Sequence, residues 1–152
     1  MSTILGLDAS STIIGWCVLQ DGRALVHGEI KLPVSNIADR CEAAQRGLVE
    51  LLEAAPIDAV AIESPVAFRP NAVIPQARVS GALLAICSLR EVAWLEIEPT
   101  RAKKALTGRG GASKDEMQAK AAEWGVRGEH ASDALGIALA AVPRVLVEGA
   151  AA

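Results

Sequence analysis

The sequence predicts an α/β fold: a mixed five-stranded sheet, three antiparallel strands followed by two parallel ones, with helices on both faces. Three observations support this prediction. Asp21-Gly22, between two apolar runs, is typical of the tight turn of a β-hairpin. The run AVAIE at residues 59–63 is nearly all apolar, as in strands buried on both faces. Elsewhere apolar residues recur at helix spacing, and strands that alternate with helices indicate a layered α/β domain.

The first three strands come from short apolar runs near the N-terminus. Thr3–Asp8 and Ile14–Gln20 are such runs, and Ala24–Leu32 follows the Asp21-Gly22 turn with a less regular alternation. Because a tight turn joins the second run to the third, we expect the three segments to form an antiparallel meander.

The middle of the chain alternates helices with strands. Apolar residues at helix spacing predict a helix over Ile37–Ala54, and the apolar run Ala59–Glu63 predicts a buried strand. Ser64–Pro75 carries three prolines and is expected to be a loop. An apolar helix over Gln76–Arg90 and a short strand over Ala93–Ile97 follow.

Helices are expected to fill the rest of the chain, at Pro99–Leu106, from Ser113 to near Gly125, and at Glu129–Val142. The glycine-rich segment Thr107–Ser113 is a loop. Ser113 with Glu116 three residues later has the spacing of a capping box, which marks the start of a helix. The tail beyond Pro143 is expected to be weakly ordered.

Composition indicates one domain over residues 1–152. With 152 residues and 51% apolar composition, the chain can build an aliphatic core. No apolar run approaches the ~20 residues of a membrane span, and the N-terminus lacks the pattern of a signal peptide. Cys17, Cys41 and Cys87 lack the spacing of a zinc site or a disulfide scaffold, so reduced thiols and a cytoplasmic location are expected.

The positive charges are unevenly distributed. The net charge of −3 argues mildly against nucleic-acid binding, but residues 64–90 and 99–114 contain no acidic residue. The cations of these two segments are Arg69, Arg78, Arg90, Arg101, Lys103, Lys104, Arg109 and Lys114. Polyanions respond to such patches rather than to the net charge. The alternative explanation is a pair of solvated helix faces.

Three carboxylates and one histidine form a candidate site. Asp8 ends the first strand and Glu63 ends the AVAIE strand, while His130 and Asp133 share a face of the last helix. Each has an ordinary explanation: a turn cap for Asp8, an exposed strand end for Glu63, a surface histidine for His130, a helix-dipole partner for Asp133. Together they favour a metal site, because parallel strand ends meet at one sheet edge and clustered carboxylates need a divalent cation.

Four segments carry a resemblance to a known family. They are GLDASSTIIGW, AIESP, PTRAKKALTGRGGASKDEM and HASDALGIALA. As an ordered set, they resemble the motifs of the RuvC-type Holliday-junction resolvases in the RNase H-like superfamily, from Ile4 to about Ala141. The resemblance implies an RNase H-like nuclease domain. The small size and the divergent loop after AIESP are compatible with a phage-encoded member.

The resemblance also implies roles for individual residues. Four side chains hold two divalent ions, Mg²⁺ or Mn²⁺, in that family, and they correspond to Asp8, Glu63, His130 and Asp133. Most relatives have Asp in place of His130, whose imidazole favours Mn²⁺. Lys103 and Lys114 match lysines near the scissile phosphate, and Phe68 matches an aromatic wedge at the junction crossover. The other candidate DNA contacts are Arg69, Arg78, Arg101, Lys104 and Arg109.

The implied activity is paired cleavage of a four-way DNA junction by a homodimer, without a membrane partner. Each site would hydrolyse one phosphodiester and leave a 5′ phosphate and a 3′ hydroxyl. Two alternatives stay open. LDASSTIIGW also resembles the phosphate-binding turn of actin-like and sugar kinases, although these need two such domains to bind ATP. The same fold is also compatible with a non-catalytic nucleic-acid binder, against which the four candidate ligands argue.

Overall fold

A mixed five-stranded sheet forms the centre of the computed structural model, which describes residues 2–66 and 70–150. The strand order is β3-β2-β1-β4-β5. β1 (Thr3–Ala9) pairs antiparallel with β2 (Ile13–Gln20), and β2 pairs antiparallel with β3 (Arg23–Lys31). On its other side β1 pairs parallel with β4 (Ala59–Glu63), which pairs parallel with β5 (Ala93–Ile97). The predicted sheet is confirmed.

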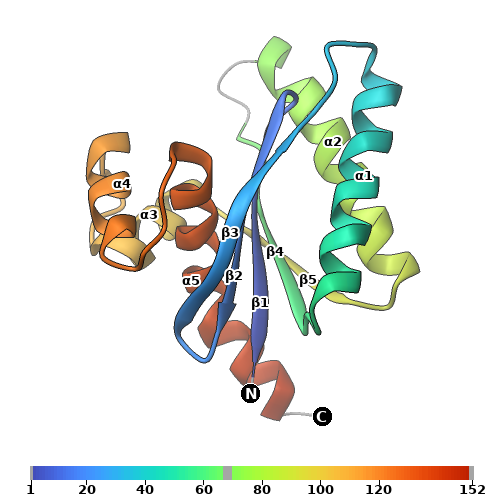
Figure 1. The fold of residues 1–152 in the computed structure, drawn as a ribbon. Helices are drawn as coiled ribbons and strands as arrows, with labels where there is room; N and C mark the ends of the chain where they lie inside the picture. The colour runs from blue at the N-terminus through green and yellow to red at the C-terminus, as the bar shows by residue number, and fades with distance from the viewer. Residues whose placement is uncertain (1, 67–69, 151–152) are drawn as a thin grey trace.

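Helices cover both faces of this sheet (Figure 1). α1 (Ile37–Ala54) and α2 (Pro70–Leu89) pack on one face. The other face carries α3 (Pro99–Thr107), α4 (Lys114–Ala122) and α5 (Glu129–Ala150). Every residue of β1 is buried between these layers, so the strand is a rigid support for whatever its carboxyl end carries. None of the described helices is long and apolar enough to cross a membrane.

The α2 helix begins earlier than predicted. Ser64–Pro75 was expected to be a loop throughout, but the helix starts at Pro70 and continues through Pro75. Proline is tolerated at the first helical position, because the N–H it lacks has no partner there. Pro75 removes one helical hydrogen bond, and the carbonyl left without it belongs to Asn71, an exposed residue that water can reach.

The α5 helix also ends later than predicted. The tail beyond Pro143 was expected to be weakly ordered, but the helix runs on to Ala150. Val142 and Val145, on either side of the proline, pack against the core of this face. The apolar contact therefore outweighs the hydrogen bond that Pro143 removes.

Two glycines let α5 lie directly on the central strands. A Cβ on Gly6 would lie 2.1 Å from the carbonyl oxygen of Ala134. A Cβ on Gly15 would lie 2.3 Å from the backbone carbonyl group of His130. Gly15 is also the β2 partner of Asp8 in the antiparallel register. The missing side chains thus bring the first turn of α5 next to the end of β1.

We expect Gly6→Ala to destabilise the fold by about 1–3 kcal/mol, the usual cost of overpacking a core, since the obstacle is backbone and cannot rotate away. Urea unfolding at equilibrium measures the change. Gly111→Ala is the matched control, because a Cβ there meets nothing within 4 Å. Equal stability of the two variants would contradict the close packing of α5 on β1.

Candidate active site

The carboxyl ends of β1 and β4 meet the start of α5 at one edge of the sheet. Leu7 and Ile62 are partners in the parallel register, so Asp8 and Glu63 follow at matching positions on neighbouring strands. Matching positions in adjacent strands point to the same face. The strand order and register therefore bring together two carboxylates that are 55 positions apart in the sequence.

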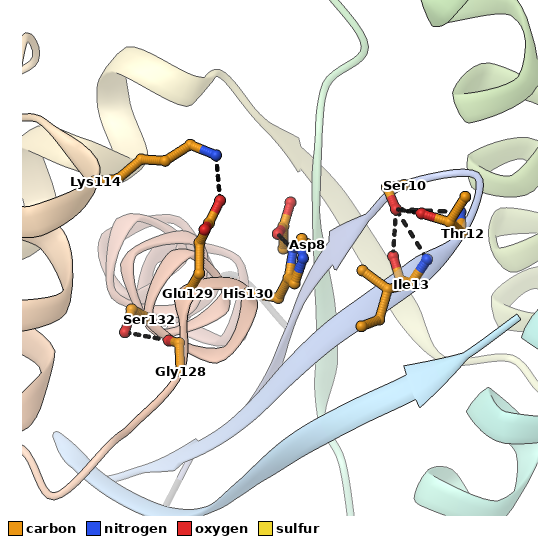
Figure 2. Close-up of polar contacts among 9 residues, drawn as sticks. All are labelled: Asp8, Ser10, Thr12, Ile13, Lys114, Gly128, Glu129, His130 and Ser132. Carbon is orange, nitrogen blue, oxygen red and sulfur yellow. Dashed lines mark hydrogen bonds and ion pairs between the residues drawn. The ribbon is translucent and has the colours of Figure 1, made fainter.

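His130 joins this edge through a hydrogen bond to Asp8 (Figure 2). The Nδ1 atom of His130 lies 2.9 Å from Oδ2 of Asp8, whose side chain is only 12% exposed. The hydrogen bond to Asp8 raises the pKa of His130. When the imidazole is neutral, Nδ1–H donates to the carboxylate and Nε2 keeps a free lone pair. That nitrogen is available as a metal ligand or a proton acceptor.

The other two carboxyl groups are held in an environment that disfavours their charge. Burial, and then the charges of Asp8 and Asp133, raise the pKa of Glu63 to about 7. Burial, and then the charges of Asp8 and Glu129, raise the pKa of Asp133 to about 6. These mutual effects mean that the carboxylates are close enough to repel one another across a poorly solvated space.

The donor set suits a hard divalent cation. Within residues 2–66 and 70–150, no three His, Cys, Asp or Glu side chains already converge closely enough to hold one ion. However, three carboxyl groups and an imidazole are the donors that Mg²⁺ and Mn²⁺ accept in proteins. A bound cation would also remove the repulsion that raises the pKa values of Glu63 and Asp133. The chemistry of the residues therefore fits the metal.

Two lysines lie within electrostatic reach of this cluster. Lys103 of α3 lowers the pKa of Glu63, against the larger effects that raise it. Lys114, the first residue of α4, forms an ion pair with Glu129, the first residue of α5 (Figure 2). Sequence reasoning missed Glu129, although its position directly before His130 was a signal that could have found it.

Arg101 and Lys104 lie on another side of α3 from Lys103. They line a shallow hollow, and none of the four candidate metal ligands contributes to it. The residues of α5 that line it are Leu139, Ala140, Val142 and Pro143. The neighbours Lys103 and Lys104 point to different sides of α3 because successive helical residues are turned by ~100°. The prediction that Arg101 and Lys104 bind DNA stays a prediction.

Of the remaining predicted DNA contacts, Arg78 and Arg109 lie among the described residues. Arg109 pairs with Glu116 at 3.1 Å, and Arg78 is exposed on α2. Phe68, the predicted wedge, and Arg69 lie outside the described residues. The geometry thus brings two lysines near the four predicted metal ligands, whereas Arg101 lines the hollow beside α5 and Arg109 pairs with Glu116.

Comparison with known proteins identifies the family. The family model of the crossover junction endodeoxyribonuclease RuvC matches residues 4–141. The chain belongs to the RuvC family. RuvC from Sulfurovum sp. is 35% identical over 120 residues, 75% of each chain. RuvC from Erythrobacter litoralis is 33% identical over 150 residues, 92% of each chain.

Solved RuvC structures have the same fold. The structure of Thermus thermophilus RuvC matches with a TM-score of 0.80 and 25% identity over 96% of both chains. A second structure of that protein, in complex with Holliday junction substrate, matches with a TM-score of 0.83 and 23% identity over 97% of both chains. The predicted RNase H-like fold is confirmed.

Membership of the RuvC family excludes the kinase alternative. The matched region includes LDASSTIIGW, so this turn belongs to a nuclease domain rather than to half of a kinase. The family consists of endodeoxyribonucleases, and membership implies divalent-metal-dependent catalysis.

In a chelator, we expect thermal stability to fall as pH rises from about 4 to about 7. The ordinary pKa values are 4.5 for Glu63 and 3.8 for Asp133, and the folded values are near 7 and 6. Below the ordinary values both states are protonated. Between the ordinary and the folded values the unfolded state gives up its protons more readily than the folded state, so stability is lost until the folded values are passed. The raised pKa of His130 acts in the same direction. Melting temperatures across this pH range measure the effect.

The control for this expectation is the double variant Glu63→Gln/Asp133→Asn, which should flatten the pH dependence. Divalent metal should do the same in the wild-type protein by neutralising the cluster. A pH dependence that is the same in the variant and in the wild type would place its origin elsewhere.

Proposed function

We propose that this protein is a structure-selective endonuclease that resolves four-way DNA junctions by paired phosphodiester hydrolysis, leaving 5′-phosphate and 3′-hydroxyl nicks. The main support is that, in a RuvC-family chain, Asp8, Glu63, His130 and Asp133 lie at one sheet edge and influence one another's protonation. We also propose that residues 1–152 act as a single nuclease domain.

In the proposed mechanism, Asp8, Glu63, His130 and Asp133 would hold two divalent ions, Mg²⁺ or Mn²⁺. The chemistry that such ions would supply is activation of the attacking water and stabilisation of the departing 3′ oxygen. Asp8 orients the His130 ring by accepting a hydrogen bond from Nδ1, which leaves the Nε2 lone pair free. Lys103 and Lys114 stabilise the negative charge that develops on the phosphate in the transition state. Burial of Asp8 keeps its carboxylate in one orientation.

We further propose a homodimer, in which two active sites act on opposite strands of the junction. The exposed face of α2 supports this proposal. It presents apolar or small residues at helix spacing, which are Ile74, Ala77, Gly81, Ala85 and Leu89. A Cβ on Gly81 would meet nothing within 4 Å, so a second helix can approach closely there. Such a continuous apolar face is typical of a surface covered by a partner.

We expect Asp8→Asn to bind junction DNA but not to cut it. The amide keeps the size of the side chain and its bond to His130, but lacks the charge that attracts metal. Electrophoretic binding in a chelator and cleavage of a labelled four-way junction with metal measure the two properties separately. Asp21→Asn, an equal change at the exposed β2–β3 turn, is the control and should cut normally. Metal-dependent cleavage by Asp8→Asn would refute the site, and a wild-type protein that binds without cutting would favour the non-catalytic alternative.

We expect higher cleavage activity with Mn²⁺ than with Mg²⁺ at equal concentration. Imidazole binds Mn²⁺ better than it binds Mg²⁺, which prefers oxygen donors. Neutral His130 also lacks the negative charge that an Asp at this position would supply. His130→Asp should shift the balance toward Mg²⁺ and remain active. Initial cleavage rates over a range of both ions measure the preference. If His130→Asp is slow with either ion, the histidine acts as a general base instead.

A further inference from the structure

The contact between Lys114 and Glu129 joins two helix starts at the rim of the carboxylate cluster. Lys114 Nζ pairs with Oε1 of Glu129, although the two residues are 15 positions apart in the sequence. Figure 2 shows the lysine extending toward this carboxylate, which lies beside the Asp8–His130 pair. Glu129 immediately precedes His130, so the helix that carries two proposed metal ligands also carries the lysine's partner.

The backbone on both sides of this pair is fixed. Ser113 caps α4 by accepting a hydrogen bond from the backbone N–H of Glu116, whose side chain in turn accepts from the N–H of Ser113. At the start of α5, the Ser132 hydroxyl donates to the carbonyl of Gly128 at 2.6 Å. What remains free is the long lysine side chain, and Glu129 selects one of its many orientations.

The pair contributes little to folding. The side chains of Lys114 and Glu129 are 71% and 39% exposed, and exposed ion pairs of this kind are weak. A weak pair is easily exchanged, so a DNA phosphate can take the place of the glutamate. The ammonium also responds to Asp133 and Asp8, which means that it is held close to the cluster and not merely at the surface.

We propose that Glu129 is a positioning residue that holds the Lys114 ammonium beside the carboxylate cluster and releases it to the phosphate of bound DNA. This inference rests on the proposed nuclease function. Lys103 provides the contrast: no ion pair involves it among the described residues, and it acts on Glu63 directly. Lys103 therefore interacts with the carboxylate cluster directly, whereas Lys114 is held near it by its ion pair with Glu129.

The test is a double-mutant cycle of Glu129→Gln and Lys114→Ala on single-turnover cleavage of a four-way junction. Glu129→Gln should cut about tenfold more slowly at saturating enzyme, with unchanged or tighter binding, because a misplaced group costs rate rather than affinity. In the Lys114→Ala background the same substitution should have no further effect. Glu123→Gln, which breaks the exposed Lys120–Glu123 pair on the outside of α4, is the matched control and should cut normally.

A second measurement does not depend on cleavage. In a chelator and without DNA, NMR titration of ¹³C-labelled lysine, with Lys114 assigned through Lys114→Arg, should give a lower pKa for Lys114 in Glu129→Gln than in the wild type. Wild-type cleavage by Glu129→Gln, equal slowing in both backgrounds, or an unchanged lysine pKa would each overturn the proposal. If the wild-type protein does not cut junctions, the proposed function is wrong, and the titration still decides whether the pair exists.

Discussion

The candidate active site depends on how closely the first turns of α5 approach the central strands. Gly15 is the strand partner of Asp8 and lies under the backbone of His130, where a Cβ would be only 2.3 Å away. A side chain at this position would lift the helix from the sheet and separate His130 from Asp8, which are now 2.9 Å apart. Asp133 belongs to the same part of the helix and would move with it. The absence of one side chain therefore positions half of the proposed metal ligands.

This close packing has an electrostatic cost. It brings carboxyl groups together in a space from which water is largely excluded. Burial and mutual repulsion disfavour their charged forms, and the pKa values of Glu63 and Asp133 are raised as a result. The protein offsets only part of it, through His130 and the two nearby lysines. A site that repels its own charges in this way gains most when a divalent cation enters. Relief of the repulsion between these carboxylates would therefore contribute to the metal binding that family membership implies.

Local sequence signals predicted most of the fold, because they involve neighbouring residues. Asp21 and Gly22 have the positive φ angles of a tight hairpin turn, and both hydrogen bonds of the Ser113–Glu116 capping box are present. The two boundaries that differ most from the prediction both involve a proline inside a helix, at Pro75 and Pro143. A proline's local cost is visible in the sequence. The sequence does not show that the carbonyl freed by Pro75 is exposed to water, or that the residues around Pro143 pack against the core.

The limits of sequence reasoning are clearest for charge. Asp8 and Glu63 were predictable because strand ends are visible in the apolar pattern, and His130 and Asp133 because three residues separate them. The segment 99–114 is purely basic in sequence, yet two of its cations, Arg109 and Lys114, find acidic partners from outside it.

A run of like charges in a sequence does not predict which of those charges are available to DNA, because ion pairs formed in the folded protein determine this. Of the neighbours Lys103 and Lys104, helix geometry turns the first toward the carboxylates and the second toward the hollow between α3 and α5. The same basic segment therefore serves two surfaces. In the proposed mechanism, a phosphate at the active site would meet Lys103 directly and would compete with Glu129 for Lys114, so two lysines of one basic run would become available to DNA in different ways.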